Sequence, residues 1–400
     1  MGAPADTSNL RELIDEILTD DSLRAGALLS DEWLALLVSA LEALPAFAAV
    51  RDKHLNTGRG SLGFSTDLLA LAVLRRAQEK GVAQGLREFQ EFLTQEARGG
   101  RIVMLISSVF VLVPITVAEG ISLVPLEGLK SNTLDSYRSI APLLGGHMLN
   151  VAAALVIRHV VQPAFMVPAP QPDDEKVSTA LAQLEDARRC LCFFGPSTPV
   201  DVTYFWEADD DGFGLEGASW AGPIVELIGH EHSHSMTEPE LHKYRDYFAR
   251  FTALPEHDKR VLRVAIDRVN RALRRHWSVD AAIELGVALE AFFLSDEDQS
   301  ELSYRLRLRC AWWLGETPEE RIQLMEWAGV IYKCRSVAVH RGYLAEKLQE
   351  KWAKGFRGLD TRKFIHEGCG RVLRAIALAL ERGMPDWATL VLGEGFTRNP

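Results

Sequence analysis

The most apolar run of the chain, residues 102–118, limits the possible folds more than any other segment. It contains no charged residue, and its length reaches the lower limit for a helix that crosses a bilayer. However, it is rich in β-branched residues, Pro114 interrupts it, and the turn-like pair Glu119-Gly120 leads into a second apolar stretch at 121–124. β-branched residues favour strands and proline breaks helices. The run therefore predicts consecutive buried strands rather than a membrane helix.

Residues 10–95 show apolar positions at helical spacing, most clearly at 33–37 and 68–74. Between those two stretches, residues 58–63 match the glycine-rich dinucleotide fingerprint letter for letter. That fingerprint needs a buried strand before it and the start of a helix after it, whereas the preceding segment looks helical. We interpret residues 58–63 as a loop, and the sequence predicts no cofactor.

A proline-rich break at 163–172, with four prolines in ten residues, prevents regular structure and marks a boundary. A helix is expected at 177–192 and a strand at 200–206, and from residue 238 onward the pattern is entirely helical. The sequence thus predicts an α+β protein in three parts: a mixed helix/strand sensing or regulatory region at 1–165, a small connecting α/β segment at 173–235, and an all-α helical bundle at 238–400.

The helices of the C-terminal part have recognisable starts. Thr317 is followed by Pro318 and, three residues after the threonine, by Glu320, so a cap, a first-turn proline and a capping-box glutamate agree. Other helices are expected to begin near Pro239, Pro255, Ser278, Asp296 and Asp360. Each of these segments carries apolar residues on one face, which favours packing as a bundle.

Charge is divided unevenly along the chain. Residues 241–400 hold 27 Lys and Arg against 22 Asp and Glu, a balance of +5. Because the whole chain carries −11, residues 1–240 carry −16. This is consistent with RNA that contacts the C-terminal part alone, although +5 over 160 residues is also compatible with an ordinary surface.

The compartment is inferred from the N-terminus and the cysteines. No basic stretch leads into an apolar run near residue 1, so we expect no secretory signal. Five cysteines, an odd number, fit reduced thiols in a cytoplasm better than disulfides. Cys190 and Cys192 form a lone pair, which does not make a zinc site.

Two polar segments could suggest metals. His230, His232 and His234 would lie on one side of an extended chain, where they could hold zinc or copper, but no fourth ligand follows at a known spacing. Residues 207–212 resemble the start of a calcium loop, yet its twelfth position is Ala218 instead of glutamate. We expect a solvated loop and no metal, and keep a metalloprotein centred on His230 as a rival interpretation.

An arginine and a histidine stand five residues apart near the end of an apolar helix, at Arg335 and His340. A guanidinium can hold a phosphate through two parallel hydrogen bonds, and an imidazole can move a proton near neutral pH, so the pair suffices for RNA cleavage without a metal. The spacing alone is not specific. Comparable pairs are Arg250 with His257 and Arg271 with His276.

The surrounding sequence is more specific. The stretches 288–294, 301–306, 309–311 and 331–336, followed by His340 and Gly342, resemble the ApeA-like branch of the HEPN superfamily, with Arg341 as an extra residue before the glycine. The resemblance covers the C-terminal part only. It implies a small helical bundle, and a metal-independent endoribonuclease of toxin or antiphage systems that pairs two copies of the Arg and His motif across a dimer.

From this resemblance we predict four site residues. Arg335 would bind the scissile phosphate and His340 would transfer protons while the 2′-hydroxyl attacks, leaving a cyclic phosphate. Glu290 would orient Arg335 or His340, or form a structural salt bridge with Arg305 or Arg309, and Ser336 would support the site. Five residues of helix turn through about 140°, so a shared face requires a bend or a helix end.

The predicted partners are RNA, a second copy of the chain that completes the active site, and a regulatory protein, and no membrane contact is expected. The alternative is a non-catalytic HEPN module that binds RNA, nucleotide or a partner protein, with Arg335 as a ligand contact and His340 as a cap on the helix end.

Overall fold

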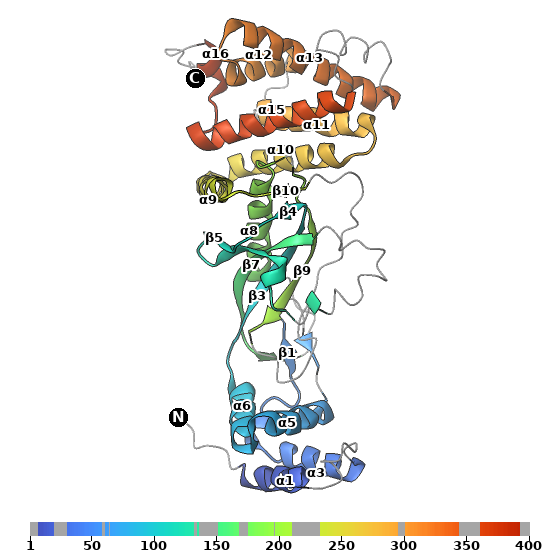
Figure 1. Ribbon diagram of the computed structural model, residues 1–400, viewed down its shortest axis with the longest axis vertical. Coiled ribbons are helices and arrows are strands. Elements are labelled where there is room, and N and C mark those ends of the chain that lie inside the picture. Colours follow the sequence, from blue (N-terminus) through green and yellow to red (C-terminus); the bar gives the residue numbers. More distant parts are fainter. Residues whose placement is uncertain are drawn as a thin grey trace.

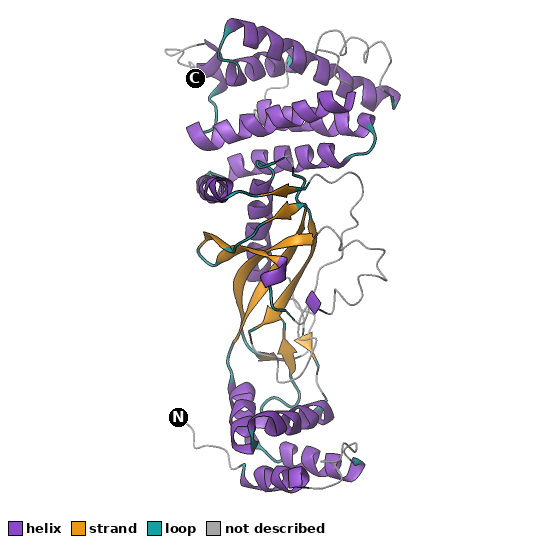
Figure 2. Cartoon of the chain, viewed as in Figure 1, coloured by secondary structure: helices purple, strands orange, loops and turns teal. Residues whose placement is uncertain are grey.

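The computed structural model describes residues 7–19, 30–57, 61–63, 65–131, 134–135, 151–167, 175–195, 197–209, 233–294, 301–343 and 361–392. The molecule is elongated, with N-terminal helices at one end, a β-sheet in the middle and a helical bundle at the other end (Figure 1). The two termini lie at opposite ends of the long axis. Strands are confined to the middle of the molecule (Figure 2), so the fold mixes helices with antiparallel sheets, consistent with the predicted α+β class.

The N-terminal helices form a core of their own. They are α1 (Ser8–Thr19), α3 (Asp31–Glu42), α4 (Pro45–Ala48), α5 (Thr66–Lys80) and α6 (Val82–Thr94). Serines set two of the starts, because Ser30 accepts a hydrogen bond from the Trp33 amide and Ser65 from the Leu68 amide. The apolar faces close on one another around a fully buried Phe89, which confirms the helical pattern predicted for this region.

The described residues on either side of residues 58–60 form paired strands. Strand β1 (His54–Asn56) pairs antiparallel with β2 (Ser61–Leu62) and, on its other side, with β8 (Phe165–Met166). A strand rather than a helix therefore precedes the glycines, contrary to our expectation, while residues 58–60 lie outside the described residues. Ser61 and Leu62, inside the glycine-rich stretch, form the short strand β2 that pairs with β1, whereas the dinucleotide fingerprint has a turn there that opens directly into a helix, so the described geometry is not that of this fingerprint.

The central sheet has five strands in the order β5-β6-β7-β3-β9, all antiparallel. They are β5 (Ile115–Ala118), β6 (Ile121–Pro125), β7 (Val151–Val161), β3 (Arg98–Ser107) and β9 (Asp201–Ala208). The apolar run therefore forms strands, as predicted, and Gly120 turns the chain between β5 and β6 with a φ of 75°. Among the described residues, no helix has the length and apolar character needed to cross a membrane.

The sheet crosses the boundary that the prolines suggested. Strand β9 belongs to the predicted connecting segment, yet it pairs along β3 from Gly100 to Ile106. Helix α8 (Glu175–Leu191), also from that segment, packs on β7 and β3. Residues 175–209 thus complete the sheet, because an edge strand and a covering helix bury the face that the first strands leave open. The rest of that segment, residues 210–232, lies outside the described residues.

The C-terminal part is helical, as predicted. It comprises α9 (Glu238–Ala253), α10 (Glu256–Arg274), α11 (Ser278–Phe293), α12 (Leu302–Leu314), α13 (Pro318–Arg341), α15 (Thr361–Arg382) and α16 (Trp387–Leu392). The start of α13 is capped as expected, since Thr317 and Glu320 exchange hydrogen bonds. The start expected near Asp296 lies outside the described residues. Two short strands, β4 (Val109–Phe110) and β10 (His234–Ser235), pair where the sheet meets the bundle.

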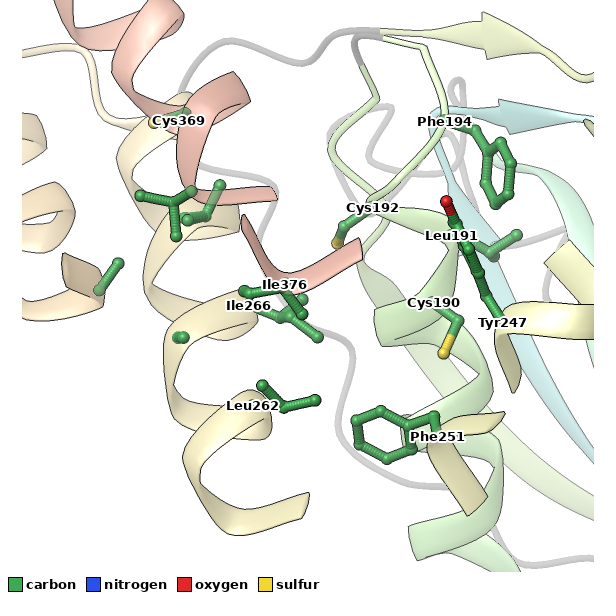
Figure 3. Packing of buried hydrophobic residues seen from close by; sticks show 14 of the residues in the cluster. Cys190, Leu191, Cys192, Phe194, Tyr247, Phe251, Leu262, Ile266, Cys369 and Ile376 are labelled. Carbon is green, nitrogen blue, oxygen red and sulfur yellow. The ribbon is translucent and has the colours of Figure 1, made fainter. Parts of the chain in front are cut away.

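The sheet and the bundle share one hydrophobic core. Figure 3 shows Cys190 and Leu191 at the end of α8 beside Phe251 of α9, with Leu262 of α10 and Ile376 of α15 facing them. Charged side chains tie the same elements together. Asp186 of α8, nearly buried, accepts from Nε and Nη2 of Arg263 on α10 at 2.8 and 2.7 Å, and from Nη1 of Arg189 at 3.0 Å. All five cysteines are buried and free.

Candidate functional site

Arg335 lies where α13 crosses closely over α11. A Cβ added at Gly286 would stand 2.5 Å from Cβ and Cγ of Arg335, closer than such atoms approach. A glycine at 286 therefore lets the two helices come together with the arginine stem between them. The stem of Arg335 is packed against α11, and the side chain as a whole is 31% exposed.

Glu290, one turn further along α11, is the partner of this arginine. Nη2 of Arg335 donates to Oε2 of Glu290 at 3.3 Å. The predicted contact between these two residues is therefore present, whereas Arg309 donates to the carbonyl of Phe293 and lies over the ring of Trp387. Burial raises the pKa of Glu290 above its ordinary value, and the charge of Arg335 partly opposes that rise.

The guanidinium of Arg335 keeps unused donors. Its single hydrogen bond to a described residue is the one to Glu290, and its Nε is buried without an acceptor among the described residues. An arginine has five N–H donors in a planar fork. The Nε donor is too buried to reach a ligand, so the N–H groups of Nη1 and the second N–H of Nη2 are the ones available to an anion such as phosphate.

His340 does not join Arg335 within one chain. Helix α13 continues through both residues and ends only at Gly342, whose φ of 68° forms the C-terminal cap. A shared face would require a bend or a helix end between Arg335 and His340, but α13 runs without a break from Pro318 to Arg341, so about 140° of helical rotation separates the two residues. His340 is exposed and forms no hydrogen bond or ion pair with the rest of the described chain.

Ser336 is half-buried, and its hydroxyl makes no hydrogen bond to another described residue. The supporting role predicted for it therefore has no visible partner. Sequence reasoning missed Tyr332 and Tyr304, which line an open hollow beside the start of α12, one helical turn before Arg335. Both lie in the stretches that carry the family resemblance, at 301–306 and 331–336, but neither is predicted as a site residue because an aromatic residue on a helix is far more often part of a core.

Basic residues gather at the same end of the bundle. The C-terminal end of α13, the turn between α10 and α11, and the start of α15 all lie at that end (Figure 1). Arg275, His276, Arg362 and His366 line one small cavity between the turn and α15. Trp277, in the turn itself, leaves 71% of its surface exposed. Arginines beside an exposed aromatic ring suit a single-stranded nucleic acid, whose bases stack and whose phosphates are anionic.

In two other candidates from the sequence, the Arg250 and His257 pair and the histidine loop, Arg250 and His234 have structural partners among the described residues. Arg250 donates through Nη1 to the carbonyls of Leu380 and Glu381, at the C-terminal end of α15, which is a structural use of its charge. The histidine loop is only partly visible, because His230 and His232 lie outside the described residues. His234 pairs with Glu240 at 3.0 Å, and no cluster of three or more potential metal ligands occurs in the described part.

Comparison with known proteins gives no relative, since no protein-family model, no curated protein and no solved structure matches this chain.

Proposed function

We propose that this protein is a metal-independent endoribonuclease of the HEPN type that acts as a homodimer. The observation that carries the proposal is the arrangement of Arg335, which is positioned by Gly286 and Glu290 while most of its donors remain available. In this proposal Arg335 binds the scissile phosphate and stabilises its growing negative charge. His340 transfers the protons.

The reaction is an attack of the neighbouring 2′-hydroxyl oxygen on phosphorus. A neutral imidazole takes the 2′-hydroxyl proton, the bond from phosphorus to the 5′-oxygen breaks, and a protonated imidazole supplies the proton to that oxygen. The products are a 2′,3′-cyclic phosphate and a free 5′-hydroxyl. One chain offers a single His340 on the far side of α13 from Arg335, so a second copy is required to supply the acid and to face the phosphate.

The outer face of α13 supports pairing of two copies. Ile322 and Val339 on this helix, and Tyr343 just beyond it, are each at least half exposed. Val339 and Tyr343 stand close to His340 in the sequence, and in this proposal they are covered when two copies pair. A homodimer through α13 would bring the two His340 side chains together at the basic end of the bundle.

The resemblance carries one further proposal, that the cleavage serves toxin-like or antiphage defence. We also propose that residues 1–165, which the resemblance does not cover, sense a trigger or bind a regulatory partner. A second candidate function, a non-catalytic module that binds RNA, nucleotide or protein, is favoured by the separation of Arg335 and His340 within one chain. Under that alternative Arg335 contacts the ligand and His340 only caps α13.

The test uses total cellular RNA in excess chelator, with the wild type and His340→Ala. The matched control is His257→Ala, which removes an equally exposed histidine from a pair of comparable spacing. We expect cleavage with cyclic phosphate ends by the wild type and the control, and a loss of at least a hundredfold in His340→Ala. RNA binding without cleavage in all three proteins would favour the non-catalytic module, and equal cleavage would remove His340 from the mechanism.

A further inference from the structure

A cavity lies at the junction between the sheet and the bundle, away from Arg335. Its volume is about 640 Å³, which is within the range of pockets that hold small organic ligands. The turn after α8 forms one wall with Cys192, Phe193 and Phe194, and helices α9, α10 and α15 form the others. The Tyr247 side chain directs its hydroxyl toward this turn (Figure 3).

One wall carries a polar cluster with fixed geometry. The Tyr247 hydroxyl donates to Oε1 of Glu381 at 2.7 Å, and Lys243 Nζ lies 3.6 Å from the same oxygen. Lys243 also stands 5.0 Å from the centre of the Tyr247 ring. The hydrogen bond from Tyr247, with the charge of Lys243, lowers the pKa of Glu381, so this carboxylate is ionised and already has partners.

The remaining charges show which ligand fits. Glu240, the other carboxylate of the cavity, receives hydrogen bonds from Thr237 and pairs with His234. Arg374 lines the cavity and forms no ion pair with a described residue, and Lys243 has further donors. The acceptors are engaged while cationic donors remain, so the cavity is complementary to an anion.

The apolar lining indicates the rest of the ligand. Phe193 and Tyr247 meet edge to face with ring centres 5.3 Å apart, and Leu373 and Leu378 of α15 also line the cavity. Such walls take up an aromatic or other apolar ring. We propose that this cavity binds a small organic anion, a ring-sized apolar body with one negatively charged group held by Arg374 and Lys243. The proposal does not depend on the ribonuclease.

The probe is 1-anilinonaphthalene-8-sulfonate, a fluorescent aromatic sulfonate, titrated into the full chain. Gly370→Leu should block binding, since Gly370 lines the cavity and a Cβ there meets no atom within 4 Å. Arg374→Ala should weaken binding about tenfold through loss of a charged hydrogen bond. The control, Arg382→Ala, removes an exposed arginine from the same helix outside the cavity, and we expect less than a twofold change.

Thermal unfolding of each variant verifies its fold, and Arg374 is exposed, so its truncation leaves the structure intact. The proposal is overturned if the wild type shows no saturable binding. It is equally overturned if folded Gly370→Leu binds the dye as the wild type does, or if Arg374→Ala and Arg382→Ala weaken it to the same extent.

Discussion

The two helical parts at opposite ends of the sheet differ in whether their hydrophobic core is separate from that of the sheet or continuous with it. The N-terminal helices surround a core that includes Phe165 of β8 and shares no residue with the core of the bundle. The bundle instead continues its core into the sheet through α8, with Asp186 and Arg263 across the junction. The comparison teaches that helical content does not define an independent unit. What defines one is where the buried apolar surface is contiguous.

The comparison predicts two unfolding transitions, and the largest effect should come from Phe89→Ala. Removal of this fully buried ring should cost about 3–5 kcal/mol through lost burial and the cavity left behind. Calorimetry should show that one transition moves to a lower temperature while the other stays in place. A single transition that shifts as a whole would contradict the division into two cores.

Asp186→Ala should affect the other transition. It removes one carboxylate partner from each of Arg263 and Arg189 at a nearly buried site, while Glu256 still pairs with Arg263 and Asp267 with Arg189, so the cost should be about 1–3 kcal/mol. Together, the two variants assign each transition to one core. An Asp186→Ala protein that loses the transition assigned to Phe89 would show that the N-terminal helices depend on the junction.

Replacing either of two helical glycines of the bundle by alanine should change the stability of the protein, in opposite directions at the two positions. Gly286→Ala forces its Cβ against Arg335 and should destabilise the protein by about 1–3 kcal/mol. Gly370→Ala has open space and should stabilise α15 by about 0.5–1 kcal/mol, because alanine loses less backbone entropy than glycine. Denaturant unfolding of both variants measures the contrast, and equal effects would mean that α11 and α13 do not approach closely.

Trp277→Ala tests the basic end of the bundle as the RNA surface. Loss of one stacked base should weaken binding of single-stranded RNA by about 1–3 kcal/mol, with little change in stability because the ring is mostly exposed. Fluorescence anisotropy with labelled RNA gives the affinity. The control is Phe110→Ala, which removes an exposed aromatic ring on β4. An equal loss of RNA affinity in both variants would show that the basic end of the bundle is not the RNA-binding surface.

The smallest expected effect concerns Glu290. Its folded pKa is raised mainly by burial, so its contribution to stability is fully present below the unfolded pKa and is lost as pH rises through the folded value. The wild type should therefore lose stability relative to Glu290→Gln as pH rises above the ordinary pKa of a glutamate and through the raised folded pKa of Glu290, by less than about 1 kcal/mol given its partial exposure. Chemical denaturation at several pH values across this rise measures the difference in stability between the two proteins. The opposite trend would mean that the charge of Arg335 outweighs burial in setting the pKa of Glu290.

Local patterns predicted much of this architecture. The β-branched run gave strands, and Thr317, Pro318 and Glu320 marked the start of α13, because these signals act through the backbone of nearby residues. The pairing of β9 with β3 could not be read in the same way. It depends on sheet hydrogen bonds between residues about a hundred positions apart, which leave no local signal across the proline-rich break.

The candidate site likewise combines features set by local sequence with features set by long-range packing. The sequence by itself determined that Arg335 and His340 lie on one helix that ends at Gly342, since helical periodicity and a glycine cap are local properties. Only the tertiary structure decided that Arg335 packs on Gly286 and pairs with Glu290 while His340 stays in solvent. The physical reason is that a side chain's partners are set by how helices cross, and crossing depends on the packing of whole faces.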